Sequence, residues 1–253
     1  MPRVLIIVED APAGPLGVGA GRPSVRSERN ALEKRPWREL DSIEGVVEDR
    51  FVRPLLLGAT LLPFRMLDSA LAIVPWQGER LLHGGDDELD DYPGLASWWR
   101  RAEAIWDAHR RSERMSLIER QDYHRGLSGQ FPIPPICVVY SQAGVRLAAP
   151  RVEDARAVVD HKLFVATASS IEEARYLTAV LNTAELTERI RPYQSLGEFG
   201  PRDFDKYVFH VPIPLFDPTQ PRHVALVALA ERAETIASTA DVEGVGFQRR
   251  LPK

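Results

Sequence analysis

The stretch "HKLFVATASSIEEARYLTAVLN" (161–182) contains a change of secondary structure within one short segment. Residues 161–169 predict a β-strand, and Ser170 with Glu173 has the spacing of a capping box, in which hydroxyl and carboxylate bond to backbone N–H groups at a helix start. The helix should end at Asn182 and bury positions on one face: Ala174, Leu177 and Leu181. A strand followed directly by a capped helix indicates a mixed α/β fold.

The segments before and after this stretch predict further strands and helices. Upstream, "ALAIVP" (70–75) predicts a strand, and "PICVVYSQ" with "VRLAAPR" predicts a hairpin that turns at Ala143-Gly144. Downstream, Thr183 is expected to cap a second helix, which stops at Pro192. "KYVFHVPIPLF" (206–216) predicts a strand, and Pro221 opens a last helix at about 221–238. We therefore expect an α/β (α+β mixed) fold, with a mixed or antiparallel sheet and flanking helices.

A tryptophan-rich segment predicts an amphipathic helix that ends near Arg114 and follows an exposed acidic loop (83–94). Its apolar positions share a helical spacing: Leu95, Trp98, Trp99, Ala102, Ile105 and Trp106. We expect the tryptophans to pack in the core. The opposite face is charged and carries Arg100, Glu103, Asp107, Arg110, Arg111 and Arg114. These arginines either pair with Glu103 and Asp107 one turn away or form a basic functional face.

The opening stretch "VLIIVEDAPAGPLGVGAG" (4–21) pairs an apolar strand with a glycine-rich loop, as nucleotide-binding sites do. The following residues, "RPSVRSERNALEKRPW", lack the apolar stripe of a helix that packs on a sheet, and no Lys-Ser or Lys-Thr pair follows the last glycine. We therefore interpret residues 1–35 as a strand and a flexible Gly/Pro/Arg-rich linker. Residues 36–240 are then the main domain, and residues 241–253 a flexible tail.

Composition excludes several classes of protein. The chain has 253 residues, 44% of them hydrophobic, and no apolar run of the roughly 20 residues that a membrane span needs. Residues 1–10 lack the features of a signal peptide, and the single cysteine, Cys137, fits a reducing cytoplasm as a packed thiol in a strand. The histidines and lone cysteine offer no zinc-ligand spacing. We expect a cytoplasmic protein that contacts no membrane and binds no metal.

The net charge of −4 is unevenly distributed along the chain. Residues 94–162 carry 11 Lys and Arg against 8 Asp and Glu, whereas residues 1–93 carry 11 against 16 and residues 163–253 carry 10 against 12. Only the middle third is net basic, which suits contact with phosphates or bases on one face.

The order of these segments resembles a known family. "YLTAVLNTAELTERIRPYQSLGEFGPRDFDKYVFHVPIPLFDP" is similar to part of the C-terminal target-recognition domain of adenine-specific DNA methyltransferases of restriction–modification systems. The specificity subunits of type I restriction systems have a similar arrangement. "VEDRFVRPLLLGATLLPF" (47–64) resembles the segment that introduces this domain, and residues 127–166 resemble its central sheet. The resemblance covers roughly residues 36–239 and implies a DNA-recognition module.

The motifs that such an enzyme needs for catalysis are missing. The family holds the target adenine with an Asp/Asn/Ser-Pro-Pro-aromatic motif, but the one Pro-Pro here lies in "IPPI" (133–136). The cofactor loop is also absent, so the opening stretch looks like the connector that follows a catalytic domain. We expect no methyltransferase activity, no catalytic residue and no cofactor.

The resemblance implies double-stranded DNA as a partner and polar side chains in its major groove, where arginine suits guanine and glutamine suits adenine. The candidate nucleic-acid-binding residues are Arg110, Arg114, Tyr123, His124, Arg125, Gln130, Gln142, Arg146, Lys162, Arg202 and Lys206. Lys206 has an alternative role, which is to form an ion pair with Asp203 or Asp205. Tyr123 has the alternative of packing in the core.

Two other functions compete with DNA recognition. The chain could be a protein-interaction module that docks on a separate methyltransferase or restriction subunit without reading DNA, which its negative charge favours. A hydrolase is the third reading, but no G-x-S-x-G, H-E-x-x-H or close carboxylate pair is present.

Overall fold

The computed structural model describes residues 5–12, 19, 21–29, 33–112, 114–144, 146–194, 196–197, 200–201 and 203–242, with only the backbone at 196–197 and 200–201. It contains helices and mixed sheets, so the predicted mixed α/β class is confirmed. The chain forms two compact units, and neither is continuous in sequence. Unit 1 comprises Met1–Leu57, Ser69–Ile133 and Ala155–His161, and unit 2 comprises Gly58–Asp68, Pro134–Asp154 and Lys162–Lys253. The structure thus differs from the expected division into a linker and one domain over residues 36–240.

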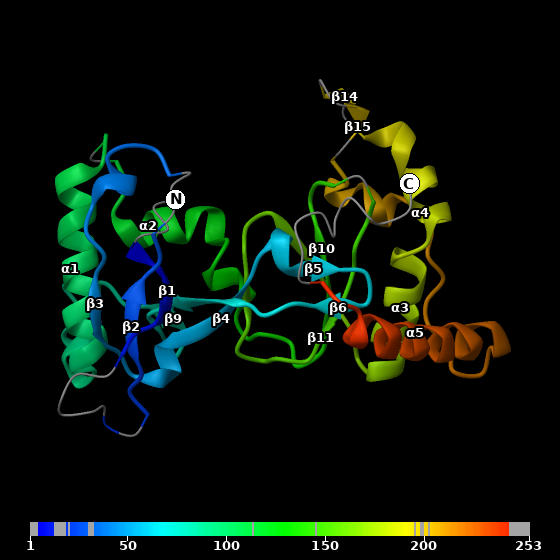
Figure 1. The fold of residues 1–253 in the computed structure, drawn as a ribbon, viewed down its shortest axis with the longest axis horizontal. Helices are drawn as coiled ribbons and strands as arrows, with labels where there is room; N and C mark the ends of the chain where they lie inside the picture. The colour runs from blue at the N-terminus through cyan, green and yellow to red at the C-terminus, as the bar shows by residue number, and fades with distance from the viewer. Residues whose placement is uncertain are drawn as a thin grey trace. The chain divides into compact units, whose positions relative to one another are not determined.

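Unit 1 is built on a six-stranded sheet in the order β12-β4-β7-β1-β2-β3. Figure 1 labels its strands β1, β2, β3 and β4. Its strands are β1 (Ile7–Asp10), β2 (Ser24–Ser27), β3 (Glu44–Val46), β4 (Val52–Leu56), β7 (Ala70–Ile73) and β12 (Val158–Val159). Neighbouring strands are antiparallel except β12 and β4, which run parallel. β7 confirms the strand expected at 70–75.

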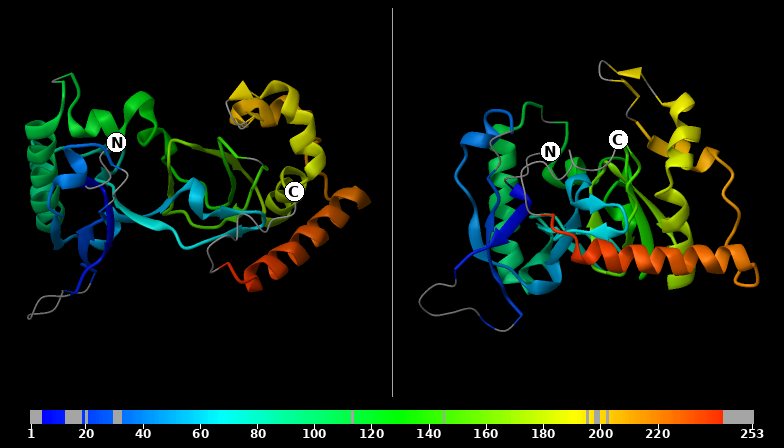
Figure 2. Two further views of the ribbon diagram at one scale, coloured as in Figure 1. Left: turned by 45° about the horizontal axis from the view of Figure 1, so that its top comes forward. Right: turned by 45° about the vertical axis from the view of Figure 1, so that its right-hand side comes forward.

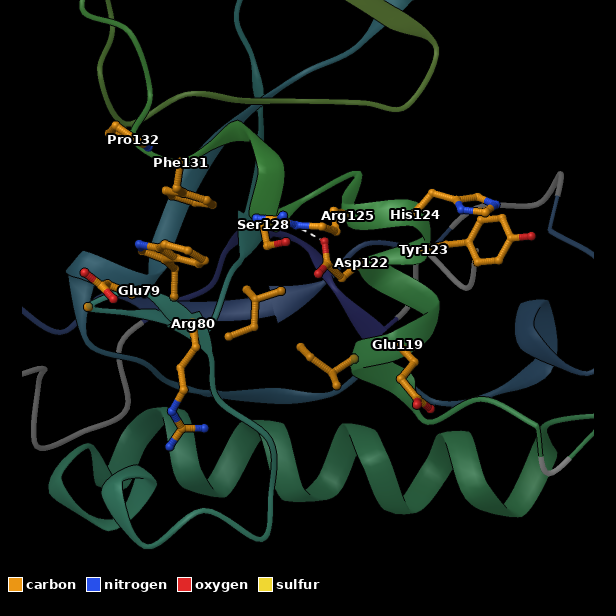
Figure 3. A pocket seen from close by; sticks show the side chains of 14 residues that line it. Glu79, Arg80, Glu119, Asp122, Tyr123, His124, Arg125, Ser128, Phe131 and Pro132 are labelled. Carbon is orange, nitrogen blue, oxygen red and sulfur yellow. Dashed lines mark hydrogen bonds between the residues drawn. The ribbon is translucent and has the colours of Figure 1, made fainter.

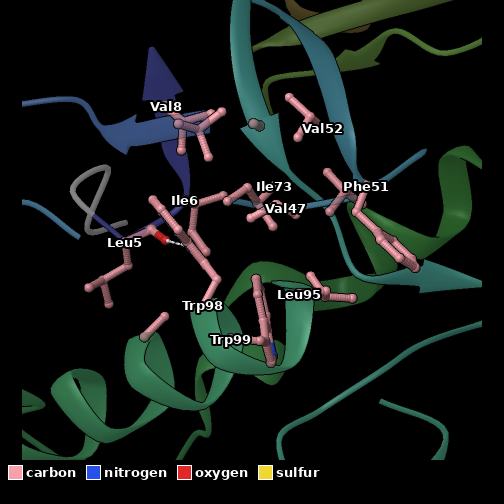
Figure 4. Packing of buried hydrophobic residues seen from close by; sticks show 14 of the residues in the cluster. Leu5, Ile6, Val8, Val47, Phe51, Val52, Ile73, Leu95, Trp98 and Trp99 are labelled. Carbon is pink, nitrogen blue, oxygen red and sulfur yellow. Dashed lines mark hydrogen bonds between the residues drawn. The ribbon is translucent and has the colours of Figure 1, made fainter. Parts of the chain in front are cut away.

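Helix α1 (Pro93–His109) packs on this sheet and supplies the tryptophans of the core (Figure 4). Trp98 and Trp99 are buried against Ile6, Val47 and Ile73, as the helical spacing predicts. The indole Nε1 of Trp98 donates to the Leu5 carbonyl oxygen at 3.1 Å, so the buried indole is not left without a partner. The other elements of unit 1 are short: η2 (Trp37–Glu39), η3 (Asp49–Phe51), β8 (Trp76–Gln77), β9 (Arg80–Leu81), η5 (Asp87–Asp91), α2 (Leu117–Gln121), η6 (Tyr123–Arg125) and η7 (Ser128–Gln130).

Unit 2 combines a three-stranded antiparallel sheet, β11-β10-β13, with α-helices. The strands are β10 (Cys137–Ser141), β11 (Arg151–Val152) and β13 (Leu163–Thr167), and the helices are α3 (Ile171–Leu181), α4 (Ala184–Ile190) and α5 (Pro221–Thr239). Figure 2 shows α5 in orange and red as one straight helix. The remaining elements are η4 (Gly58–Thr60), β5 (Leu61–Leu62), β6 (Arg65–Met66), η8 (Arg191–Tyr193), β14 (Leu196–Gly197), β15 (Gly200–Pro201) and η9 (Asp205–His210).

The helix starts of unit 2 follow the local signals in the sequence. The Ser170 hydroxyl accepts the Glu173 N–H at 3.1 Å, while the Glu173 carboxylate accepts from Ser169 rather than Ser170. Half of the predicted capping box is therefore formed. Thr183 caps α4 by accepting the Leu186 N–H at 3.2 Å, and Pro221 is the first residue of α5. These starts are confirmed because they depend on contacts within one turn.

The expected linker contains a strand of the sheet. Val25 and Ser27 of β2 are fully buried, and β2 lies between β1 and β3. The Ser27 hydroxyl accepts the Ile43 N–H at 2.8 Å, which satisfies a polar group inside the core. Four residues with a single aliphatic side chain give too little alternation for a sequence pattern to detect. Residues 13–18, 20, 30–32 and 243–253 of the expected linker and tail lie outside the described residues.

Two other expected elements have different ends. Helix α1 stops at His109 instead of near Arg114, because Arg110 adopts an extended backbone. In the expected hairpin, β10 does pair with a later strand, but that strand is only Arg151–Val152, so the connection is longer than a turn at Ala143-Gly144.

The prediction of a strand at 206–216 is wrong. The first part of this segment forms the 3₁₀ helix η9, and residues 211–216 form no strand. Phe204, Val208 and Val211 are the buried positions, and their spacing of four and three residues follows a helical period instead of a strand's alternation. Pro212 and Pro214 also lack the N–H groups that a sheet requires.

Candidate nucleic-acid interface

The structure divides the predicted nucleic-acid-binding residues between the two units. Unit 1 holds Arg110, Arg114, Tyr123, His124, Arg125 and Gln130, and unit 2 holds Gln142, Arg146, Lys162, Arg202 and Lys206. Arg202 lies outside the described residues.

In unit 2, the residue after β10 gathers three segments that are far apart in the sequence. The Gln142 N–H donates to the Lys162 carbonyl oxygen at 2.8 Å. The Gln142 carbonyl oxygen accepts the N–H groups of Phe204 at 2.7 Å and Asp205 at 3.1 Å. Lys206 follows directly, so Gln142, Lys162 and Lys206 come from adjacent backbone segments at one end of β10.

Arg146 belongs to the same region. A Cβ atom added at Gly144 would lie 3.2 Å from the Arg146 carbonyl oxygen and 3.3 Å from the Phe204 ring, so this loop lies close against the segment that carries Lys206. We call Gln142, Arg146, Lys162 and Lys206 the β10 corner.

The cations of the β10 corner are exposed. Within the part of the chain that the structure describes, Arg146, Lys162 and Lys206 form no ion pair. The alternative pairing of Lys206 with Asp203 or Asp205 is therefore not formed among the described residues. The corner offers three positive charges and one amide to a ligand.

Aromatic side chains lie on η9, which carries Lys206, and on η8. Tyr193 is 55% exposed and Phe209 is 48% exposed. The rings of Tyr193 and Tyr207 are 6.4 Å apart, and those of Tyr207 and His210 are 5.5 Å apart. Exposed rings beside cations suit stacking on nucleic-acid bases. The rings of η9 were not predicted because residues 206–216 were expected to form a strand, and the four-residue spacing of the buried Phe204 and Val208 was the signal that could have found them.

In unit 1, three predicted residues line one cavity of about 650 Å³, which we call the Tyr123 pocket (Figure 3). Phe131 and Glu79 lie at one end and Tyr123 and His124 at the other. The lining residues are Trp76, Gly78, Glu79, Arg80, Leu81, Ile118, Glu119, Asp122, Tyr123, His124, Arg125, Ser128, Phe131 and Pro132. Tyr123 is 50% exposed, so the alternative that it packs in the core is wrong.

A left-handed turn holds the residues at the Tyr123 end. His124 and Arg125 have φ angles of 55° and 58°, in a region that costs non-glycine residues roughly 1–2 kcal/mol each. The Asp122 carboxylate accepts the N–H groups of Leu127 at 3.0 Å and Ser128 at 2.7 Å, which fixes the chain on the far side of the turn. Two successive residues in this conformation at a cavity point to a functional constraint.

The other end of the pocket is an aromatic stack. The rings of Trp76 and Phe131 are 4.1 Å apart and nearly parallel, and the Arg53 guanidinium lies 5.0 Å from the Phe131 ring. Both faces of Phe131 are covered, so its ring serves as a support for Trp76.

Two predicted contacts are used inside the fold. The Gln130 amide donates to the carbonyl oxygens of Gly126 and Val159 and accepts the Val159 N–H at 2.9 Å. The Arg110 guanidinium donates to the Met115 carbonyl oxygen at 2.9 Å and pairs with Asp107 at 3.2 Å. Both side chains therefore have a role inside the fold, and contact of either one with a base or a phosphate stays a prediction. Arg114 is exposed, and its backbone N–H donates to the Ser112 hydroxyl at 3.3 Å.

Burial raises the pKa values of two ionisable groups in β10. Burial raises the pKa of the Cys137 thiol to about 11, so the thiol is protonated at neutral pH, as expected for a packed strand cysteine. Burial, with the nearby Asp205 carboxylate, also raises the pKa of Tyr140, whose hydroxyl donates to the Asp205 carbonyl oxygen at 3.1 Å. That bond ties β10 to the segment before Lys206.

The described residues show neither a metal centre nor a membrane span. Within these ranges, no group of three or more His, Cys, Asp or Glu side chains could hold a metal ion. No helix there has the length and apolar character needed to cross a membrane.

No model of a protein family matches the chain, and no curated protein matches it.

Proposed function

We propose that the chain is a catalytically incomplete module that recognises duplex DNA, as part of a restriction–modification or related adenine methyltransferase system. We infer the restriction–modification system from the resemblance of roughly residues 36–239 to a target-recognition domain. The observation that supports DNA as the ligand is that Gln142, Lys162 and Lys206 come together at the β10 corner.

The chemistry of the corner suits a duplex. Lysine and arginine contact phosphates without sequence preference, whereas a glutamine amide pairs with the adenine edge in the major groove. The backbone of Gln142 is held by three hydrogen bonds, and its side chain is bonded to no residue that the structure describes. A fixed backbone with an uncommitted amide is the arrangement that base readout requires. With DNA as its partner, the module would act in the cytoplasm, beside a separate catalytic subunit.

Equilibrium binding tests this proposal. Fluorescence anisotropy with a labelled duplex should detect binding of the full chain at about 20 mM salt and weakening as salt rises. The double variant Lys162→Gln/Lys206→Gln should flatten the salt slope by about two units, roughly one for each phosphate that is no longer neutralised.

The matched control is Arg222→Gln/Arg232→Gln, which removes two exposed charges from α5 of the same unit. It should leave the slope nearly unchanged. Equal effects of the two variants would mean that only net charge matters, and the β10 corner would lose its role.

Exposed apolar side chains favour a second function, docking on a methyltransferase or nuclease subunit. On α5, Leu229 is 54% exposed and Ile236 is 68% exposed. If the chain binds no duplex at about 20 mM salt, this protein-interaction module becomes the better account.

A further inference from the structure

Most charged groups of the Tyr123 pocket already have partners. Arg80 pairs with Asp86 at 2.7 Å and with Glu88 at 3.2 Å. The Glu119 carboxylate accepts the Ser116 N–H at 2.7 Å, which lowers the pKa of Glu119. Asp122 accepts two backbone N–H groups, as described above. These groups shape the pocket and are not available as the main contacts of a ligand.

Four lining side chains have no such commitment. Glu79, Tyr123, His124 and Arg125 form no hydrogen bond or ion pair through their side chains with another described residue. Glu79 stands at the Trp76–Phe131 end, and Tyr123 with His124 at the opposite end (Figure 3). The pocket thus presents a free acceptor at one end and free cationic or phenolic donors at the other.

Apolar side chains occupy the wall between these ends. Trp76, Leu81 and Ile118 line the cavity, and Trp76 is half-buried with Phe131 behind it. A volume of about 650 Å³ lies in the range of small-molecule sites, roughly 300–1,000 Å³. A flat ring system against the indole, with an amino group at Glu79 and an anion at Arg125 and His124, would engage three of the four uncommitted side chains.

We propose that the Tyr123 pocket binds a single unstacked nucleotide. The base lies against Trp76, its exocyclic amino group donates to the Glu79 carboxylate, and its phosphate is held by Arg125 and His124. Adenine, cytosine and guanine carry such an amino group, whereas thymine does not. The left-handed turn at His124 and Arg125 presents the phosphate-binding side chains. This binding is separate from duplex recognition and needs nothing from the β10 corner.

Calorimetric titration of the full chain with AMP and adenosine tests the phosphate contact. AMP should bind about tenfold more tightly than adenosine, since a charge-assisted hydrogen bond contributes about 1.5 kcal/mol or more. Arg125→Gln should weaken AMP binding about tenfold and leave adenosine binding unchanged. Arg120→Gln, which removes an exposed charge from α2 outside the pocket, should change neither.

The base contact has its own comparison. TMP should bind less tightly than AMP, and Glu79→Ala should weaken AMP about fivefold without affecting TMP. Trp76→Leu should weaken both nucleotides. If Trp76→Leu fails to fold, the comparison of AMP, adenosine and TMP on the unmodified chain still decides the matter.

Competition identifies the source of the nucleotide. A single-stranded oligonucleotide that displaces AMP, when a fully paired hairpin does not, indicates an unpaired position in DNA. Failure of both to compete indicates a free nucleotide.

Equal binding of AMP and adenosine, equal loss in Arg125→Gln and Arg120→Gln, or no heat at about 10 mM AMP would overturn the proposal. Lys162→Gln/Lys206→Gln should leave AMP binding unchanged, so the two proposals can fail separately.

Discussion

Gln130 in unit 1 and Gln142 in unit 2 look equivalent in the sequence, and the structure uses them in opposite ways. The Gln130 side chain forms three hydrogen bonds to backbone groups, including both backbone groups of Val159. Gln142 forms its three hydrogen bonds through its own backbone and leaves its amide uncommitted among the residues that the structure describes. The difference shows that residue type alone does not identify a ligand contact. What matters is whether the polar atoms of the side chain already form hydrogen bonds to neighbouring backbone groups.

The β10 corner depends on one buried ring, and removing it gives the largest expected effect. Phe204 is 1% exposed and anchors the segment that carries Lys206. Phe204→Ala should lower the free energy of unfolding of unit 2 by about 3–5 kcal/mol, the usual loss for a buried aromatic. Chemical denaturation followed by a unit 2 signal measures it. Phe209→Ala, at a half-exposed ring, is the control and should lower it by about 1 kcal/mol or less.

Substitution of the two glutamines gives the next largest effect. One variant should lose stability and the other should lose affinity for DNA. Gln130→Ala leaves the N–H and carbonyl of Val159 without their partner, which should cost about 1–3 kcal/mol of stability. It should not change duplex affinity. Gln142→Ala should change stability little and weaken binding to a preferred sequence by about 1–3 kcal/mol relative to random duplex. A Gln130 variant that loses DNA affinity while keeping its stability would break the comparison.

The left-handed turn of the Tyr123 pocket should respond to glycine in the opposite direction from a helix. His124→Gly removes the side-chain strain at a φ of 55°, and we expect a gain of about 0.5–1 kcal/mol after the entropy of glycine is subtracted. Arg120→Gly in α2 should instead lose about 1 kcal/mol. Thermal melting of both variants measures the contrast, and destabilisation by His124→Gly would show that the turn is not strained.

Each unit also has a helix start whose glutamate has a lowered pKa, and this gives the smallest effect. Glu119 bonds to the Ser116 N–H and hydroxyl, while the Ser169 hydroxyl and then its N–H lower the pKa of Glu173. A carboxylate whose pKa is lowered in the folded state stabilises the fold at pH values above 4.5, its ordinary pKa. This contribution is lost as the pH falls through the lowered pKa of the folded state. Glu173→Gln should therefore melt at a lower temperature than the unmodified chain at pH 7, with the gap closing as the pH falls below 4.5 and through the lowered pKa of the folded state. A gap independent of pH would contradict this assignment.

Local signals in the sequence were reliable where one turn of chain decides the structure. Thr183 and Pro221 begin helices as predicted, and the Trp98 and Trp99 spacing placed both rings in the core. β2 could not be predicted, because the burial of Ser27 depends on its pairing with Ile43.

The same limit applies to the candidate site. Composition could indicate which side chains suit DNA, and Lys162 and Lys206 are indeed exposed. It could not indicate that one hydrogen-bonded residue, Gln142, joins their segments, or that Trp76 and Phe131 stack at the pocket that the Arg125 turn also lines. Both facts depend on contacts between residues that are distant in sequence.

The most direct test of the central claim is a map of backbone amide shifts by nuclear magnetic resonance, with the full chain and a duplex at about 20 mM salt. We predict that the amide signals of Gln142, Lys162 and Lys206 move with added duplex, and that about 200 mM salt largely reverses the shifts. The signal of Gln130 should stay in place. Shifts confined to other parts of the chain, with these three signals unmoved at saturating duplex, would contradict recognition through the β10 corner.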